Sequence, residues 1–252
     1  MHGAPRNAAW RADGSHVAFA LRGAICTTLA LGAKIGTALQ SFRNITMEQP
    51  RGVAQSVQGA ITLADRMRLL CQRPVTIWLT GLSGAGKSTI AFKLEQQLVA
   101  QGRACYVLDG DNVRHGLGSD LGFDQQDRHE NIRRVAHVAQ LMNDAGLIVI
   151  TALISPMQAD RAMARDIVGA DRFVEVFVSA PFAICARRDP KGLYAKAVAG
   201  EIASFTGVSA PYEAPLDADI TIDTATLTPA ESVAGIFRYL HEKCHAPLTN
   251  KF

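Results

Sequence analysis

Short apolar runs alternate with amphipathic segments along the chain from residue 75 onward. The run 147–153 is almost wholly apolar, which is typical of a strand buried on both faces of a sheet. Runs of this kind predict strands at residues 75–79, 104–108, 147–153, 173–178 and 220–222. Because segments with helical spacing separate them, the pattern predicts an α/β fold, with a five-stranded parallel sheet between two layers of helices in a three-layer sandwich.

Helical periodicity marks the segments between these runs. Apolar residues recur every three or four positions and predict helices at residues 88–100, 128–145 and 159–168. Gly146 is the expected C-cap of the long helix. The last helix is expected to begin at a capping box at residues 228–231, in which a proline occupies the first helical position.

The segment 187–215 interrupts this alternation between the fourth and fifth predicted strands. It contains three prolines and three glycines, with a helix-like piece at residues 195–203. Long irregular excursions in a compact domain are commonly functional or disordered. Its charged and aromatic residues lead us to expect a mobile lid over a site.

Charge divides the chain into two parts. Residues 1–75 carry nine Lys and Arg against three acids, a net charge of +6, whereas residues 76–252 carry 17 against 20, a net charge of −3. We therefore predict a basic N-terminal extension at residues 1–70 and a folded domain at residues 71–252. The extension has three interpretations: a disordered or mis-assigned upstream segment, an organelle transit peptide, or the remnant of a fused domain.

Composition excludes several classes of protein. A chain that is 48% hydrophobic and 19% charged is globular rather than disordered. The longest charge-free run, residues 145–159, has 15 residues, fewer than the ~18 that a membrane helix needs. Five scattered cysteines without zinc-ligand spacing favour free thiols and a cytoplasmic protein. A net charge of only +3, with no dense basic run among aromatic residues, argues against a nucleic-acid partner.

Residues 81–88 match the phosphate-binding motif G-x-x-x-x-G-K-S/T in full, between a predicted strand and a predicted helix. Glycines let backbone N–H groups surround phosphate oxygens, and the helix N-terminus adds partial positive charge. Lys87 is expected at the β- and γ-phosphates and Ser88 on Mg²⁺. The motif therefore predicts a site for a nucleoside triphosphate with Mg²⁺.

Two carboxylates, Asp109 and Asp111, follow the second predicted strand. Open α/β sheets bind ligands at the carboxyl ends of their strands. A carboxylate there can orient a metal-bound water or accept a proton from an attacking hydroxyl. A solvated turn is the alternative, because Asp-Gly and Asp-Asn pairs are common in turns. The complete phosphate loop favours the functional interpretation.

Basic residues gather at two further places. The group around the start of the long predicted helix is Arg114, Arg128, Arg133 and Arg134. Arginine donors that converge on a cleft suit phosphate or sulfate, although a solvated basic helix face is the alternative. The group at the entrance of the lid is Arg187, Arg188 and Lys191. It would supply positive charge to a transferring phosphoryl group.

Several segments in order resemble the adenylylsulfate kinase (APS kinase) family of P-loop kinases. These segments are residues 78–89, 108–117, 121–123, 127–128, 130–134, 154–156, 188–194, 205–207 and 211–215. The phosphate loop alone indicates only a P-loop protein, whereas the combination is specific to this family and spans about residues 70–245. Gly118-Ser119 and Met157 depart from its common pattern.

The resemblance implies transfer of the γ-phosphoryl group of ATP, with Mg²⁺, to the 3′-hydroxyl of adenosine 5′-phosphosulfate (APS) in sulfate assimilation. The implied ATP-binding residues are Gly81, Leu82, Ser83, Gly84, Ala85, Gly86, Lys87, Ser88, Thr89 and Arg188. The implied acceptor-binding residues are Arg114, Phe123, Arg128, Asn131, Ile154, Ser155, Lys191 and Phe205. The two phenylalanines would enclose the adenine of APS, and Ser88 and Asp109 would hold the metal.

The resemblance also bears on the catalytic group. We predict that Asp111 lies nearest the attacking hydroxyl, with Asp109 as the second choice, and that Lys87 stabilises charge. Direct in-line transfer is the simplest mechanism. The family has also been assigned a phosphoserine intermediate, which would fall on Ser155; a turn beginning at this Ser-Pro pair is the alternative.

Other functions stay open at this point. One is a different small-molecule P-loop kinase, and another is a non-catalytic nucleotide-binding domain of a sulfate-activating complex. Such regulatory domains usually lose the phosphate loop, which is complete here. A signalling GTPase is disfavoured because the sequence has no N-K-x-D element. The resemblance further implies a homodimer and makes ATP sulfurylase a candidate partner.

Overall fold

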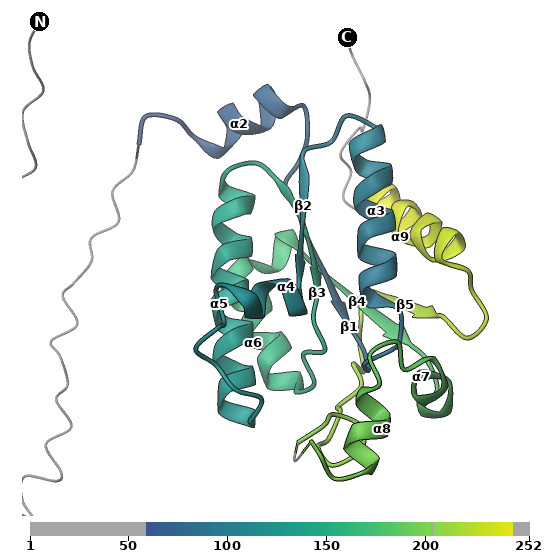
Figure 1. Ribbon diagram of the computed structural model, residues 1–252. Coiled ribbons are helices and arrows are strands. Elements are labelled where there is room, and N and C mark those ends of the chain that lie inside the picture. The colour runs from purple at the N-terminus through teal and green to yellow at the C-terminus, as the bar shows by residue number, and fades with distance from the viewer. Residues whose placement is uncertain (1–58, 203, 244–252) are drawn as a thin grey trace, which may run out of the picture. The chain divides into compact units, whose positions relative to one another are not determined.

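The computed structural model describes residues 59–202 and 204–243, coloured in Figure 1. They belong to the compact unit that begins at Gly59, and the interpretations given to residues 1–58 lie outside them. The strands are β1 (Thr76–Thr80), β2 (Cys105–Asp109), β3 (Ile148–Ala152), β4 (Phe173–Ser179) and β5 (Ile220–Asp223). They form one sheet in the order β2-β3-β1-β4-β5, with every pairing parallel. The predicted five-stranded parallel sheet is confirmed.

The centre of the sheet is buried on both faces. Every residue of β1 and β3 is buried, and their register pairs Thr76 with Val149 and Ile77 with Ile150. Strands in this position need nearly continuous apolar side chains, which is why their positions could be predicted. The order of the strands places β1, which leads into the phosphate loop, between β3 and β4.

Helices cover both faces of the sheet (Figure 1). The long helices are α3 (Lys87–Ala100), α5 (Gln125–Asp144), α6 (Gln158–Val168) and α9 (Pro229–Lys243). Helices α3 and α9 share one apolar core with Ile77 and Leu79, whereas α5 and α6 share a second core with Trp78. Successive side chains of a strand point to opposite faces, so the two cores lie on opposite sides of the sheet. The predicted three-layer sandwich is confirmed.

The long helix α5 begins three residues earlier than predicted. The carboxylate of Asp124 accepts the backbone N–H of Asp127 at 2.8 Å and so caps the helix N-terminus. At the other end Ala145, rather than the expected Gly146, is the C-cap. Gly146 follows it with a φ of +92°, a conformation that favours glycine just beyond a helix.

The capping box of α9 is confirmed. The Glu231 carboxylate accepts the backbone N–H of Thr228 at 2.8 Å, and the Thr228 hydroxyl accepts that of Glu231 at 3.3 Å. The other helices are the 3₁₀ turn η1 (Ala170–Arg172) and α2 (Leu63–Leu70), α4 (Gly110–His115), α7 (Phe182–Arg188) and α8 (Leu193–Val198). Helices α2, α4 and α7 were not predicted, because six to eight residues are too few to establish a helical period. Helix α2 lies in the segment assigned above to the extension.

Helix α8 replaces the helical piece expected at residues 195–203. The Asp189 carboxylate accepts the backbone N–H groups of Leu193 and Tyr194 at 2.8 and 3.0 Å, so the helix begins earlier than predicted. It ends at Val198. Across residues 59–202 and 204–243, no helix combines the length and hydropathy needed to cross a membrane.

Candidate active site

A cleft of about 1120 Å³ opens where β1, β2 and β3 end, and segments of the expected lid form part of its wall. Nearly all of the predicted site residues line it. The exceptions are Gly81, Leu82 and Ala85, which belong to the phosphate loop but lie outside the cleft lining. The topology thus brings together residues that lie more than 100 positions apart in the sequence.

The phosphate loop needs glycine for two separate reasons. Gly81, Gly84 and Gly86 have φ values of +149°, +74° and +102°, which side chains other than hydrogen rarely allow. In addition, a Cβ at Gly81 would lie 2.3 Å from the carbonyl oxygen of Val178, and one at Gly84 would lie 2.8 Å from that of Cys185. The motif therefore fixes both the curl of the loop and its close packing on β4 and α7.

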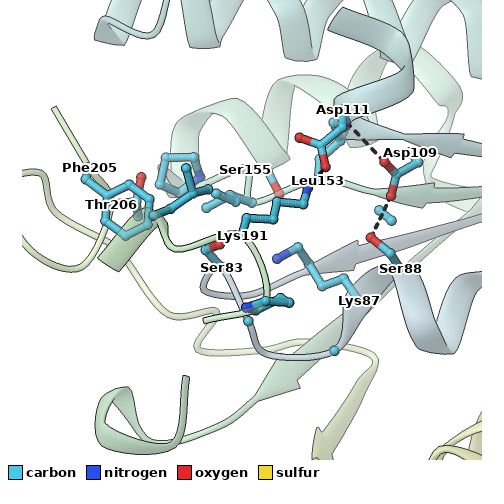
Figure 2. A pocket seen from close by; sticks show the side chains of 18 of the residues that line it. Ser83, Lys87, Ser88, Asp109, Asp111, Leu153, Ser155, Lys191, Phe205 and Thr206 are labelled. Carbon is cyan, nitrogen blue, oxygen red and sulfur yellow. Dashed lines mark hydrogen bonds and ion pairs between the residues drawn. The ribbon is translucent and has the colours of Figure 1, made fainter. Parts of the chain in front are cut away.

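Lys87, the first residue of α3, is buried and extends along the loop (Figure 2). Its Nζ donates hydrogen bonds to the carbonyl oxygens of Gly81 and Leu82, both at 2.8 Å. Burial lowers the pKa of Lys87 to about 8. A polyphosphate would offer this ammonium group negative oxygens, which the loop itself does not supply.

Ser88 and Asp109 form an oxygen pair beside Lys87. The Ser88 hydroxyl donates to Asp109 Oδ2 at 2.6 Å, and Asp109 Oδ1 accepts the backbone N–H of Asp111 at 3.1 Å (Figure 2). Hydroxyl and carboxylate oxygens are ligands that Mg²⁺ accepts, so the pair fits this ion. Among the described residues no group of three or more His, Cys, Asp and Glu side chains could hold a metal. Such an ion would therefore share its coordination with phosphate oxygens and water.

Asp111, the predicted proton acceptor, forms an ion pair with Lys191. Asp111 belongs to α4, whereas Lys191 comes from the turn before α8 in the lid (Figure 2). Both side chains are more than half exposed. The ion pair joins the two sides of the cleft and is open to solvent. Exposed ion pairs of this kind contribute little to stability.

Arg128 uses its guanidinium to join α5 to the lid. Its Nε donates to the carbonyl oxygen of Phe123 and its Nη2 to that of Ser204, each at 2.7 Å, while Nη1 donates to the Thr206 hydroxyl. Partial burial, followed by the neighbouring charge of Arg114, lowers the pKa of Arg128. Arginine stays protonated throughout the physiological range, so Arg128 is a cation in the cleft wall.

Arg114, Phe123 and Asn131 line the same part of the cleft. The guanidinium of Arg114 lies 4.4 Å from the centroid of the Phe123 ring, and the ring is exposed. Asn131 is buried, and within the described chain its Oδ1 has no hydrogen-bond partner. This buried oxygen is therefore an unsatisfied acceptor in the wall of the cleft. Phe205 also lines the cleft but is itself buried.

Other basic residues of the sequence clusters lie outside the cleft lining. Arg133 and Arg134 both bind the Glu130 carboxylate, and Arg134 also pairs with Asp120. These contacts hold the pKa of Glu130 at about 2. Both arginines thus lie on a face of α5 outside the cleft lining, where acidic side chains pair with them. Arg187 does not line the cleft either, in contrast to its neighbour Arg188.

Ser155 is buried in the loop after β3 and has a φ of +37°, which is uncommon for a residue with a side chain. Its Oγ accepts the indole N–H of Trp78 at 3.2 Å. Ser155 and Ile154 both line the cleft. The Ile154 carbonyl oxygen already accepts the Thr80 hydroxyl at 2.7 Å, so a protein donor occupies it.

Some residues of the site escaped the sequence reasoning. Thr224, directly after β5, lines the cleft and accepts Arg188 Nη1 at 3.0 Å on its hydroxyl. Thr206 lines the lid side. Tyr194 of α8 donates its hydroxyl to the carbonyl oxygen of Ser83 at 2.9 Å. A single threonine matches no sequence motif. A search of the residues that directly follow each predicted strand would nevertheless have included Thr224.

Comparisons with known proteins point to one family. The family model described as adenylylsulphate kinase matches residues 73–223. The adenylyl-sulfate kinase of Aeromonas salmonicida is 61% identical over 163 residues, which cover 65% of this chain and 83% of that protein. The bifunctional enzyme NodQ of Rhizobium sp. strain N33 is 59% identical over 172 residues, 68% of this chain and 27% of that enzyme.

A solved structure agrees with these matches. The APS kinase of Mycobacterium tuberculosis, in complex with AMPPNP and APS, is 47% identical with a TM-score of 0.65. The aligned region covers 68% of this chain and 99% of that one. The family model spans more than half of the chain, and its matched region contains the phosphate loop and the part of the cleft lined by Arg114, Phe123 and Asn131. The chain belongs to the adenylylsulphate kinase family of P-loop kinases.

Proposed function

We propose that this chain transfers the γ-phosphoryl group of ATP to the 3′-hydroxyl of APS, which yields 3′-phosphoadenylyl sulfate and ADP. The observation that carries the proposal is one cleft lined by most of the phosphate loop, by the two carboxylates at the end of β2 and the start of α4, and by Arg114, Arg128 and Asn131. Family membership supports the reaction, because the Mycobacterium tuberculosis relative was solved with an ATP analogue and APS.

The ATP half of the site comprises the phosphate loop and the residues that flank it. Lys87 would bind the β- and γ-phosphates in place of the two carbonyl oxygens that it now contacts. Ser88 and Asp109 would hold Mg²⁺, which neutralises charge on the phosphates. Arg188 donates hydrogen bonds to Thr224 beside the phosphate loop, and it would bind the nucleotide there.

The acceptor half lies where α4, α5 and the lid meet. Arg114, Arg128 and Asn131, which line this part of the cleft, would hold the phosphosulfate and the ribose. Phe123 and Phe205 would hold the adenine from two sides. Ile154 would contribute main-chain contacts near it.

Chemistry then requires alignment and a proton acceptor. The 3′-oxygen attacks the γ-phosphorus in line, a new O–P bond forms, and the bond from the γ-phosphorus to the β–γ bridging oxygen breaks, so ADP leaves. Asp111 would take the hydroxyl proton, and Lys191 would move from Asp111 toward the transferring phosphoryl group. The alternative route through a phosphoserine at Ser155 requires the hydroxyl to leave Trp78.

A turnover assay tests the proposal. Purified protein with ATP, Mg²⁺ and APS is expected to release ADP in step with APS consumption, and Lys87→Ala is expected to abolish both. Asp111→Asn should lower kcat by about 10²-fold or more if Asp111 is the base, whereas Asp144→Asn, an exposed acid outside the cleft lining, should not. ATP binding without ADP release would favour the regulatory alternative.

The same assay separates the two routes. Direct transfer predicts that Ser155→Ala retains kcat within about tenfold, because only a hydrogen bond to Trp78 is lost. A loss as complete as that of Lys87→Ala, in a variant that still binds both substrates, would support the phosphoserine route instead.

Three further assignments belong to the proposal. We expect a homodimer in the cytoplasm, with ATP sulfurylase as a candidate partner. A relative from Thiobacillus denitrificans that is 32% identical is a hexameric APS kinase. Light scattering of the purified chain, alone and with ATP sulfurylase, measures its oligomeric state and its association with that enzyme.

A further inference from the structure

Arg161 is a buried cation on α6 that does not belong to the cleft lining. Its guanidinium donates to three acceptors that lie on three separate segments of the chain. We propose that Arg161 is a positioning residue for the acceptor half of the site, because it ties the loop after β3, which lines that half, to the segment around Glu213, which leads from the lining residues Phe205 and Thr206 to β5. This inference rests on the proposed function for the identity of the acceptor.

The first of these segments is the loop after β3. Arg161 Nη1 donates to the carbonyl oxygen of Ser155 at 2.8 Å. Ile154, Ser155 and Pro156 all line the cleft, and Ser155 has the unusual φ of +37°. A backbone conformation of this kind persists only where its surroundings hold it in place. The guanidinium supplies such a restraint on the carbonyl group of the strained residue.

The second segment is the end of the lid, around Glu213. Arg161 Nη2 donates to the carbonyl oxygen of Glu213 at 2.8 Å, and the Glu213 backbone N–H donates to the carbonyl oxygen of Pro156 at 2.9 Å. The Glu213 carboxylate also accepts the first backbone N–H of α6, that of Gln158, at 2.7 Å. The chain that leads from Phe205 and Thr206 to β5 is therefore anchored against the loop at Ser155.

The third contact explains why a charge can be buried here. Arg161 Nε lies 2.7 Å from a carboxylate oxygen of Glu175 on β4, so the cation has an anionic partner. The planar guanidinium can donate hydrogen bonds to a carboxylate and two carbonyl oxygens in different directions at once. A lysine ammonium at the same place could not make the same three hydrogen bonds. Removal of the fork would leave the carbonyl oxygens of Ser155 and Glu213 without the donor that joins them.

Arg165, one turn further along α6, provides a matched comparison. It lies 3.7 Å from the same Glu175 carboxylate and 2.8 Å from that of Asp219, so it belongs to the same ion-pair network. The hydrogen bonds described for it do not include Ser155 or Glu213. If Arg161 served only to hold the fold, its replacement would weaken the binding of ATP and of APS alike.

Steady-state kinetics with each substrate varied in turn tests the proposal. The variants are Arg161→Lys, Glu213→Ala, which alters an exposed side chain and leaves the Arg161 charge paired, and Arg165→Lys as the control. We expect Arg161→Lys to raise KM for APS about tenfold, Glu213→Ala to raise it severalfold, and both to leave KM for ATP within about twofold. Arg165→Lys should change neither value by more than about twofold.

Direct binding provides the second measurement. Titration calorimetry with APS in the presence of ADP is expected to show weaker APS binding by the same factor, while ATP binding is retained. Equal losses for ATP and APS, or a loss in Arg165→Lys as large as that in Arg161→Lys, would overturn the proposal, as would an unchanged KM for APS in both Arg161→Lys and Glu213→Ala. A wild-type protein that binds ATP and does not turn over APS would instead contradict the proposed function.

Discussion

Several polar atoms in the cleft are satisfied only in part by the protein itself. Lys87 Nζ contacts two carbonyl oxygens but no carboxylate at hydrogen-bond distance, and burial lowers its pKa. Asn131 Oδ1 has no partner among the described residues, and a Cβ at Gly118 would lie 2.6 Å from it. Gly118 thus leaves room for the Asn131 amide, which gives this departure from the family pattern a structural role. Among the described residues the hydrogen-bond acceptors of Lys87 are thus neutral, and a bound phosphate would supply a charged one.

The first prediction is that Lys87 takes up a proton when ATP binds. The pKa of Lys87 in the free protein is about 8, and nearby phosphate charges raise it, because they favour the protonated form. Below pH 7 the lysine is already protonated, so binding should take up less than about 0.1 proton at this residue. Near pH 9 the free lysine is mostly neutral, and uptake should reach about 0.8 proton per ATP.

Calorimetric titrations of ATP in buffers of different ionisation enthalpy measure this uptake. Lys93→Met, a change on the same helix outside the cleft lining, should keep the pH dependence. Equal uptake at pH 7 and pH 9 would mean that Lys87 does not change its charge on binding.

The lid is attached to the phosphate loop through an aromatic element. Tyr194 on α8 contacts Phe182 and Phe205 edge to face, with ring centroids 5.5 and 4.9 Å apart. Its hydroxyl donates to the carbonyl oxygen of Ser83, and burial raises the pKa of Tyr194, so this donor stays protonated at neutral pH. One helix of six residues therefore contacts both the ATP loop and a ring of the acceptor half.

Tyr194→Phe removes that hydrogen bond and keeps the ring. The loss of one bond between neutral groups is about 1 kcal/mol, so we expect KM for ATP to rise about fivefold while the thermal midpoint falls by only a few degrees. Tyr239→Phe is the control, because its hydroxyl donates to Asp219 at 3.1 Å, outside the cleft lining. Parallel changes in KM for both variants would mean that the effect of Tyr194 is one of stability alone.

At the scale of the whole molecule, the sequence predicted the layers well because parallel strands and long helices each impose a repeating apolar pattern. The phosphate loop was predictable too, since its chemistry lies in eight consecutive residues. The contacts of Thr224 and Arg161 could not be predicted, because they join residues far apart in the sequence. Thr224 contacts Ala85, 139 positions away, and Arg161 contacts Glu213, 52 positions away. Such pairs become neighbours only through the order of the strands.

The boundary of the folded unit gives the last prediction. A chain that begins at Gly59 contains every described element, and a chain that begins at residue 71 lacks α2. Leu70 of α2 packs over Gly146, where an added Cβ would lie 2.9 Å from Leu70 Cδ1. Since α2 has no buried residue, its removal should lower the thermal midpoint by only about 2–5 °C.

We expect the chain from Gly59 to keep the kcat of the full chain within about twofold and its thermal midpoint within about 2 °C, because the described cleft residues all lie after α2. Calorimetric melting measures the thermal midpoint, and the ADP-release assay measures kcat. Both are applied to the full chain, to the chain from Gly59 and to the chain from residue 71. Full activity and an unchanged melting temperature from Gly59 onward would mean that residues 1–58, whose net charge is +4, contribute to neither fold nor chemistry. Lost activity with an unchanged melting temperature would instead mean that residues 1–58 act on the site itself.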